Sequence, residues 1–315
     1  MEPKKVSVIM GVYNEQLTWV EDSISSILNQ SYNNIEFIIV LDNPNNNILK
    51  EYLLKKSLED NRVKIIINEK NLGLVKTLNL AINKSSGEYI ARMDADDISY
   101  VERIKVQVNY LNEHNDIAMV GSKIEFINEE GESIQGDRFR PCSYLEIKRH
   151  LKYYNAFAHP TMMYRSNIIK EINAYSEIEC AEDYELAIRF ILAGYKVANL
   201  DKVLLKYRLR ATSISQSNRI KQFIVSEYIK KIYRKNINGD YKKFDIDELN
   251  RILNDKKIVK SYDKYLCIID KCEKEKKISN YIKITLVCLS DKYALRSISE
   301  KISYYIQRKV IKLRN

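Results

Sequence analysis

The sequence predicts an α/β fold with a doubly wound, mostly parallel sheet in its N-terminal two thirds. Short apolar runs rich in β-branched residues alternate with amphipathic stretches over the first hundred residues, as they do in βαβ units. The runs hardly alternate between apolar and polar residues, which is typical of parallel strands covered on both faces. We expect strands at 6–10, 37–41, 63–67 and 89–93.

Capping signals predict where the intervening helices begin. Glu21 follows Thr18 at the capping-box spacing, Glu102 follows Ser99 in the same way, and each pair opens an amphipathic stretch. A third helix is expected after Gly73. Right-handed βαβ units of this kind bind ligands beyond the carboxyl ends of their strands, so the residues that follow the four strands deserve most weight.

Beyond residue 115 the hydrophobic pattern becomes mixed. Helices are expected at 143–154 and at 182–193, where Gly194 ends an apolar helical stripe. The remaining apolar segments are short and lie between turn residues, which predicts strands at 117–122, 123–127, 161–164 and 203–209.

Composition excludes several classes of protein. Hydrophobic residues make up 45% of the 315 residues, enough to bury a core. The five cysteines include no C-x-x-C pair, which argues against a disulfide framework or a zinc cage, and three scattered histidines argue against a histidine-based metal site. The apolar start at 6–12 has no cleavage site and no apolar stretch is long enough to span a membrane, so we expect a cytoplasmic protein.

Positive charge is concentrated in the last third of the chain. Residues 216–315 hold 25 Lys and Arg against 12 Asp and Glu, a net charge of +13, together with nine of the 23 tyrosines. Such a segment suits an anionic membrane surface or a nucleic acid, although helices with solvated lysine faces explain the charge equally well. The shift in composition predicts a domain boundary between 1–215 and a helical region at 216–315.

The strongest chemical signal is Asp94-Ala95-Asp96, which comes directly after an apolar strand. Two carboxylates on a tight turn can present oxygens to a hard divalent cation that bridges a diphosphate. Helix capping by Asp96 or Asp97 is the alternative explanation. The position at the end of a strand favours a metal site.

Three more residues follow strands or open a helix in this region. Asp42 can accept the imino N–H of uracil or the hydroxyls of ribose, or it can simply be a turn residue before Asn43 and Pro44. Tyr13 can stack on a base or pack in the core. Lys76 can reach a diphosphate, although a solvated helix lysine is the more frequent case.

Further along the chain, Glu182 and Asp183 open a helix, where the helix dipole favours acidic residues. One carboxylate at that position can also face the cleft and remove a proton from an acceptor hydroxyl. His159, before Pro160, can line the same cleft, but a lone histidine is more often structural.

Several motifs follow one another along the chain, at 6–15 (VSVIMGVYNE), 26–31 (SILNQS), 71–73 (NLG), 87–97 (GEYIARMDADD), 182–183 (ED) and 207–215 (YRLRATSIS). In this order they together resemble the family 2 glycosyltransferases of the GT-A fold. The resemblance covers about residues 4–215 and is specific because independent motifs occur at suitable spacing. The Ala91–Asp97 segment most resembles the branch that builds bacterial capsules and exopolysaccharides, where galactosyl transfer is common.

The resemblance implies a metal-dependent, inverting hexosyltransferase. It would move galactose, another hexose or an N-acetylhexosamine from a UDP-sugar to a hydroxyl of a glycan or a lipid-linked acceptor, in capsule or exopolysaccharide synthesis. It implies that Asp96 binds Mn²⁺ or Mg²⁺ and that Asp183 is the general base. The mixed region after residue 115 would lie on the acceptor side. The residues implied to bind the nucleotide sugar are Val12, Tyr13, Glu15, Asp42, Lys76, Arg92, Asp94 and Ala95.

Two positions depart from the pattern of the family. Gly11 stands where Pro or Thr is frequent, which only loosens the nucleotide pocket. Arg210 stands where a metal-binding histidine is frequent. Either Arg210 contacts the diphosphate directly or the metal has fewer protein ligands. His159 and Arg210 are therefore candidate contacts to the acceptor or the diphosphate.

The alternative function is a catalytically inactive nucleotide-sugar-binding or scaffold protein. The intact acidic triplet together with Asp183 argues against it. We expect no nucleic-acid partner, because the chain has no recognised nucleic-acid fold or aromatic motif. The basic region at 216–315 instead predicts attachment to the inner face of the cell membrane, and the sequence carries no indication of an oligomeric state.

Overall fold

The computed structural model describes residues 3–136, 140–210, 218–237, 239 and 244–275. The chain divides into two compact units, Met1–Lys148 with Asn155–Ser213, and Arg149–Tyr154 with Ile214–Asn315. The domain boundary expected after residue 215 lies outside the described residues and stays a prediction. We describe each unit by itself.

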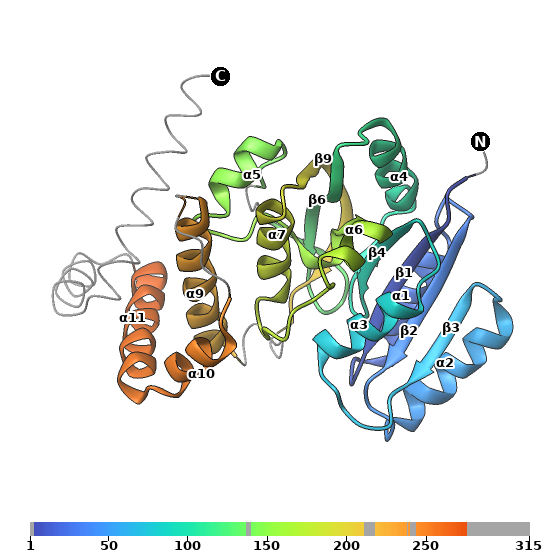
Figure 1. Ribbon diagram of the computed structural model, residues 1–315. Coiled ribbons are helices and arrows are strands. Elements are labelled where there is room, and N and C mark those ends of the chain that lie inside the picture. The colour runs from blue at the N-terminus through green and yellow to red at the C-terminus, as the bar shows by residue number, and fades with distance from the viewer. Residues whose placement is uncertain (1–2, 137–139, 211–217, 238, 240–243, 276–315) are drawn as a thin grey trace. The chain divides into compact units, whose positions relative to one another are not determined.

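The first unit is built on one sheet, in which the strands of the first hundred residues pair in parallel, as do two later strands at 117–127 and 196–208 (Figure 1). Its strand order is β3-β2-β1-β4-β8-β6-β9-β5, with β7 paired to β6. The four expected strands are confirmed as β1 (Val6–Val12), β2 (Ile35–Leu41), β3 (Val63–Ile67) and β4 (Tyr89–Asp94). The helices between them are α1 (Leu17–Leu28), α2 (Asn47–Glu59) and α3 (Leu74–Lys84).

The capping-box predictions are wrong in detail although the helices exist. Helix α1 already includes Thr18 and has Gln16 as its N-cap residue, and that side chain makes no capping hydrogen bond. Ser99 lies in the short strand β5 (Ile98–Ser99), and the helix after it, α4 (Arg103–Glu113), has Glu102 as its N-cap residue. The apolar period therefore predicted these helices better than their capping residues did.

The later part of this unit adds antiparallel pairs to the sheet. Strand β8 (Met163–Arg165) runs antiparallel to both β4 and β6 (Ile117–Ile127). The two strands expected at 117–122 and 123–127 are one strand, with a register shift between Ser122 and Lys123 where it pairs with β9. The other elements here are β7 (Ser133–Ile134), α5 (Tyr144–His150), η1 (His159–Thr161), α6 (Ser166–Glu171), α7 (Glu182–Leu192) and β9 (Lys196–Arg208).

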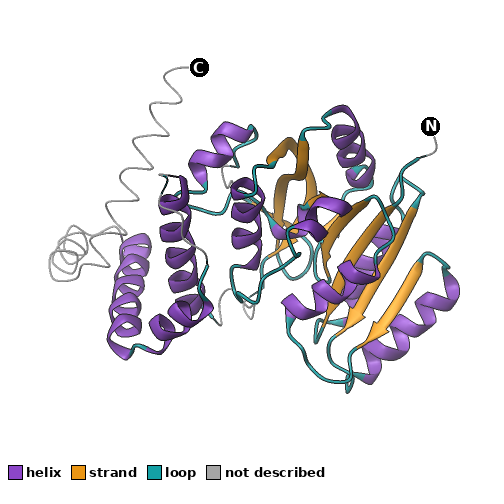
Figure 2. Ribbon diagram, viewed as in Figure 1, coloured by secondary structure: helices purple, strands orange, loops and turns teal. Residues whose placement is uncertain are grey.

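The core follows from the apolar strands. Every residue of β2 is buried, and β1 has only Gly11 partly exposed. Helix α1 contributes Trp19, Val20, Ile24 and Ile27 to the buried set. Figure 2 shows the strands and the helices that alternate with them. A sheet buried on both faces leaves its polar groups at the strand ends, and the candidate site lies at one of these ends.

The second unit is helical over its described part, as the sequence predicts. It contains α9 (Arg219–Ile237), α10 (Ile246–Asn254) and α11 (Lys256–Glu275). Aromatic side chains hold it together: the ring of Phe223 contacts those of Tyr262 and Tyr265, and Tyr228 Oη donates to the Asp245 carbonyl over 3.0 Å. Among the described residues, no helix is long and apolar enough to cross a membrane.

Candidate active site

The sheet brings the ends of its first, second and fourth strands together. Strand β1 pairs with β2 so that Val12 lies opposite Leu41, and with β4 so that Gly11 lies opposite Asp94. The residues that follow these strands therefore lie at one edge of the sheet. They include Tyr13, Asp42 and the acidic turn that starts at Asp94.

Asp42 is buried and holds the loop that leads into α3. One of its carboxylate oxygens accepts hydrogen bonds from Asn68 Nδ2 (2.6 Å) and from the Leu72 amide (2.8 Å), and the other accepts one from the Gly73 amide (2.9 Å). Gly73 has a φ of 83°, a backbone conformation that residues other than glycine rarely adopt. A carboxylate has about four acceptor positions, so one remains for a ligand.

Tyr13, Glu15 and Lys76 lie on the solvent side of this edge. The Tyr13 ring is 42% exposed, and its backbone amide donates to Glu15 Oε2 over 2.7 Å, which fixes the turn after β1. Val12 is buried, and its carbonyl accepts the Asp42 amide at 2.7 Å. Lys76 Nζ lies 3.9 Å from Glu177 Oε1. The exposed Tyr13 ring is thus free to stack on a planar ligand, which core packing would not allow.

Three carboxylates gather after β4. Asp94, Asp96 and Asp97 each offer an oxygen, and these oxygens lie within 4.8 Å of one another, with Ala95 buried between the first two. Asp97 Oδ1 accepts the Arg208 amide over 2.9 Å, but its buried Oδ2 accepts no hydrogen bond from the described part of the chain. Oxygen donors in this arrangement fit a hard divalent cation such as Mg²⁺ or Mn²⁺. Asp97 joins the site as a third oxygen donor that the sequence suggested only as a helix cap.

Mutual repulsion within this cluster is large. Burial, and next the charge of Asp94, raise the pKa of Asp96 to about 7, against the opposing effect of Arg210. Burial, and next the charge of Asp96, raise the pKa of Asp97 well above its ordinary value. A divalent cation would favour the ionised form of each carboxylate. The electrostatics therefore agree with the donor chemistry.

Two arginines lie beneath the acidic turn. Arg92 is 2% exposed and pairs with Asp94, and the charge of Asp94 keeps its guanidinium protonated. The neighbouring Arg103 is also buried and donates from Nη2 to the Arg92 carbonyl over 2.7 Å. Burial and the charge of Arg92 lower the pKa of Arg103 to about 9. The ion pair between Arg92 and Asp94 fixes the position of Asp94. A contact between Arg92 and the nucleotide sugar remains a prediction.

Arg208, which the sequence marked only as part of a motif, closes the turn from β9. Its Nε donates to the Asp96 carbonyl over 2.8 Å and its Nη1 to the Glu129 carbonyl over 2.7 Å. Together with the hydrogen bond from the Arg208 backbone amide to Asp97, these contacts connect the turn after β4 to the end of β9. No short sequence pattern signals this role, because the partners lie more than a hundred residues apart.

Arg210 contacts the same turn by its side chain. Its Nε lies 2.7 Å from Asp96 Oδ2. The guanidinium groups of Arg208 and Arg210 lie 5.4 Å and 5.7 Å from the centroid of the Trp19 ring, within the range of cation–π attraction. Arg210 thus lies at the acidic cluster, and its contact with the acceptor or the diphosphate stays a prediction.

Asp183 lies in the first turn of α7 and is held at both oxygens. Its Oδ2 accepts a hydrogen bond from Asn155 Nδ2 and its Oδ1 accepts the Tyr184 amide, each over 2.7 Å. Burial raises the pKa of Asp183, and burial together with the charge of Asp183 raises the pKa of Glu182 to about 7. The charge of Arg92 acts in the opposite direction on the pKa of both carboxyls, so this acidic pair and the residues of β4 interact electrostatically.

His159 is part of a buried hydrogen-bonded chain. Its Nε2 lies 2.7 Å from Tyr175 Oη, which lies 2.7 Å from Tyr164 Oη, and its Nδ1 lies 3.7 Å from Glu182 Oε1. Burial, and next the charge of Arg92, lower the pKa of His159 well below its ordinary value, so the ring is neutral. These contacts favour the structural alternative for His159 over a position in the cleft.

The segment before α7 carries unusual backbone conformations. Asn173, Ala174 and Cys180 have positive φ angles of 62°, 48° and 71°. Arg189 donates to the carbonyls of Ile172 and Ala174, while Glu185 holds its guanidinium at 2.6 Å. Strained backbone that packing holds in place is frequent at ligand sites. No pattern in the sequence marked this segment.

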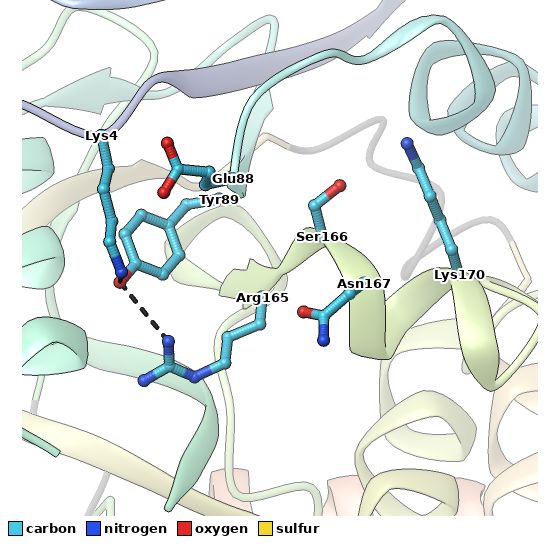
Figure 3. A pocket seen from close by; sticks show the side chains of 7 residues that line it. All are labelled: Lys4, Glu88, Tyr89, Arg165, Ser166, Asn167 and Lys170. Carbon is cyan, nitrogen blue, oxygen red and sulfur yellow. Dashed lines mark hydrogen bonds between the residues drawn. The ribbon is translucent and has the colours of Figure 1, made fainter. Parts of the chain in front are cut away.

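A cavity of about 480 Å³ lies at the other end of β4 (Figure 3). Tyr89, where β4 begins, accepts hydrogen bonds from Lys4 and Arg165 at 3.3 and 3.4 Å. Asp94 ends the same strand, so this cavity is separate from the candidate active site. It is lined by Lys4, Glu88, Tyr89, Arg165, Ser166, Asn167 and Lys170.

Comparison with known proteins decides the family. Residues 7–172 match the model described as glycosyl transferase family 2, which is more than half of the chain. The chain belongs to glycosyltransferase family 2. An uncharacterised glycosyltransferase of Methanocaldococcus jannaschii is 36% identical to it over 75% of this chain and 81% of the relative. The O-antigen biosynthesis glycosyltransferase WbnJ of Escherichia coli is 36% identical over 67% of this chain and 82% of the relative.

Solved structures agree on the fold of this family 2 glycosyltransferase. The crystal structure of S. aureus TarS 1–349 in complex with UDP-GlcNAc has a TM-score of 0.61, with 19% identity over 88% of this chain and 77% of that chain. The predicted GT-A fold is thereby confirmed. The prediction of a family 2 glycosyltransferase is confirmed as well.

The raised pKa of Glu182 predicts how stability depends on pH. A carboxyl whose pKa is about 7 in the folded protein, against an ordinary 4.5, stabilises the fold at low pH, and this contribution is lost as the pH rises through about 7. We expect the free energy of unfolding to fall by on the order of 2 kcal/mol more in the wild type than in Glu182→Gln between pH 5 and pH 8. Urea unfolding in EDTA measures this difference.

The matched control for that experiment is Glu130→Gln, which removes an exposed carboxylate from the same unit. This variant should follow the wild-type pH dependence. An identical pH dependence of the wild type and Glu182→Gln would contradict a raised pKa at Glu182.

Proposed function

We propose that this family 2 glycosyltransferase transfers one sugar from a UDP-sugar to a hydroxyl of a glycan or lipid-linked acceptor, with inversion at the anomeric carbon. The observation that carries the proposal is that Tyr13 and Asp42 lie with the acidic cluster at Asp94–Asp97 at one edge of the sheet. The charges of Arg92 and Asp94 also act on the carboxyl of Glu182, which opens α7 beside Asp183.

The donor proposal starts from Asp42. Its remaining acceptor position can take the imino N–H of uracil, a donor that cytosine lacks, while the exposed Tyr13 ring stacks on the base. Val12 and Glu15 shape the same turn, and Lys76 in the first turn of α3 would reach the phosphates. The TarS structure in complex with UDP-GlcNAc supports a UDP-linked donor. The transferred sugar is galactose, another hexose or an N-acetylhexosamine.

The chemistry proposed for the site divides between its two acidic groups. Asp94, Asp96 and Asp97 would hold Mn²⁺ or Mg²⁺, which supplies positive charge for the leaving diphosphate when it is bound. Arg92 holds Asp94 in place. Asp183 removes the proton of the acceptor hydroxyl as that oxygen attacks the anomeric carbon from the face opposite the diphosphate. The fixed orientation of the Asp183 carboxylate through Asn155 and Tyr184 supports this role.

The biological context follows from the relatives. WbnJ of E. coli is named for O-antigen biosynthesis, which supports a polysaccharide product for this enzyme. We propose capsule or exopolysaccharide synthesis within that range. An inactive nucleotide-sugar-binding protein would share the donor site but would not need a carboxylate at α7 with a raised pKa.

A donor panel tests the proposed function. The full chain is mixed with nucleotide sugars with and without Mn²⁺, and the melting temperature and the release of UDP are measured. We expect UDP-sugars to stabilise the protein in Mn²⁺, and UDP to bind more tightly than CDP because of Asp42. If no nucleotide sugar raised the melting temperature in Mn²⁺ and none released UDP, the proposal would be wrong.

We also propose that 1–215 carries the transferase activity and that the basic region at 216–315 attaches the enzyme to the inner, cytoplasmic face of the membrane. A basic residue near an anionic surface contributes roughly 1 kcal/mol, so a few oriented lysines suffice for reversible binding. Lys256, Lys257 and Lys260 are exposed near the start of α11. A lipid-linked acceptor would then lie near the attached enzyme.

Changing these three lysines to glutamine removes up to roughly 3 kcal/mol of electrostatic attraction to the membrane. We therefore expect the affinity for phosphatidylserine vesicles to fall by about tenfold or more. Flotation of the full chain at low and high salt measures this. Replacing Lys84, Lys105 and Lys202 by glutamine removes the same charge from exposed positions in the first unit and serves as the control. Equal flotation of both triple variants would contradict a membrane surface in the basic region.

A further inference from the structure

The metal-binding cluster already contains a cation supplied by the chain. Arg210 Nε lies 2.7 Å from Asp96 Oδ2, and both side chains are mostly buried, at 18% and 13% exposed. Asp96 is one of the three residues that can offer a carboxylate oxygen to a divalent ion. A guanidinium and a divalent cation cannot both approach this carboxylate closely without strong repulsion.

The contact between Arg210 and Asp96 is a charge contact with poor hydrogen-bond geometry. Arg210 Nε is buried and makes no aligned hydrogen bond among the described residues, despite its short distance to Asp96. Arg92 pairs with Asp94, and Arg208 is bound by the carbonyls of Asp96 and Glu129. Arg210 can therefore leave Asp96 without losing an aligned hydrogen bond from its Nε, whereas Arg208 would lose its bonds to two carbonyl groups.

Trp19 supports Arg210 from the side. The indole Nε1 donates to the Glu129 carbonyl over 3.1 Å, which fixes the ring, and the guanidinium of Arg210 lies 5.7 Å from the ring centroid. A ring face attracts a guanidinium without fixing it to one point, so it can support Arg210 in more than one position. Trp19 is the only tryptophan of the chain, so tryptophan fluorescence reports on the surroundings of this ring, where Arg208 and Arg210 both lie.

We propose that Arg210 is an internal counter-cation of Asp96. In the protein without donor, Arg210 covers the metal-binding oxygen of Asp96 and keeps the affinity for a free divalent cation low. When a divalent cation binds, Arg210 leaves Asp96 along the face of Trp19, and when the donor also binds it turns to the donor diphosphate. Cation and donor binding are thereby coupled through one side chain, and the coupling is reciprocal.

The first test uses Mn²⁺ alone with the full-length protein. We expect Arg210→Gln to bind Mn²⁺ about tenfold or more tightly than the wild type in the absence of nucleotide, measured by electron paramagnetic resonance of free Mn²⁺. Lys202→Gln removes an exposed positive charge from β9 and should bind Mn²⁺ as the wild type does. Equal affinities of the wild type and Arg210→Gln would overturn the inference.

A double variant shows whether the effect passes through Asp96. In an Asp96→Asn background, Arg210→Gln should no longer increase Mn²⁺ affinity, because the carboxylate that Arg210 covers is gone. A tenfold gain that persisted in the Asp96→Asn background would also overturn the inference. Folding of each variant is checked by its melting temperature in EDTA.

The second readout is Trp19 emission during titration with Mg²⁺, which does not quench fluorescence. We expect the wild type to show a change in emission as Arg210 moves along the face of the ring, and Arg210→Gln to show a much smaller one. The same change in both would contradict the movement. The inference rests on the proposed function for the identity of the diphosphate. Because neither readout contains a nucleotide, the inference can fail while the proposed function stands, and the proposed function can fail while the inference stands.

Discussion

Replacing Asp183 by asparagine should lower sugar transfer by about 10²–10⁴-fold while the affinity for the donor stays nearly constant. The asparagine amide keeps the shape of the side chain but cannot take a proton. Asp183 lies in the first turn of α7, and its hydrogen bonds to Asn155 and Tyr184 fix its direction. Transfer to a verified acceptor, with donor affinity from calorimetry, measures the two effects separately.

Glu182→Gln is the matched control for this experiment. Glu182 is adjacent in sequence but does not share a helix face with Asp183, and its Oε1 lies 3.7 Å from Nδ1 of the buried His159. We expect a much milder effect on transfer. If Asp183→Asn transferred sugar at the wild-type rate, another group would be the base and the proposed role of α7 would be wrong.

The raised pKa of Asp183 sharpens this expectation. Burial favours the protonated carboxyl, so the fraction of enzyme with an available base should rise with pH. The positive end of α7 and the two hydrogen bonds act in the opposite direction by favouring the carboxylate. A base must be ionised before it can accept a proton, and for this reason we expect transfer to decline as the pH falls.

The parallel strands were predictable because each is determined by its own residues. An uninterrupted β-branched run such as 37–41 can satisfy its apolar side chains only between two layers of helices, and β2 is indeed buried throughout. The same local logic predicted the strand ends as the place for chemistry, since polar residues such as Asp42 and Asp94 follow the runs directly. Pattern and packing agree wherever the relevant contacts are close in sequence.

The rest of the site depends on contacts that are distant in sequence. Arg208 binds the turn at Asp96 from a position 112 residues away, and Asn155 holds Asp183 from 28 residues away. Asp42 likewise holds the loop before α3 by accepting hydrogen bonds from the amides of Leu72 and Gly73, and these bonds form only when the end of β2 lies beside the start of α3. A residue type alone does not reveal such partners, because serine, asparagine and arginine are common in loops for many reasons.

Removing the Asp96 carboxylate should have the largest effect on donor binding. Asp96→Ala deletes one of three oxygens that fit a divalent cation and leaves Arg210 without its carboxylate. We expect Mn²⁺-dependent binding of UDP to be lost. Removing a residue that only contacts a metal ligand lowers metal affinity by roughly 10–100-fold, and removing a ligand itself should have a larger effect. The fold should remain intact, since the substitution also removes a carboxyl whose pKa is raised to about 7 by burial and by Asp94.

Calorimetry of UDP binding with Mn²⁺ and with EDTA gives the metal-dependent part directly. Asp22→Ala is the control, because its exposed carboxylate lies 3.7 Å from Arg208 Nη2, outside the cluster, and carries the same charge. The control should keep the difference between Mn²⁺ and EDTA. Asp96→Ala should bind UDP equally in both, and at about the affinity of the wild type in EDTA. If it instead kept the wild-type gain from Mn²⁺, the cation would bind without Asp96, and the acidic turn after β4 would have no role in holding it.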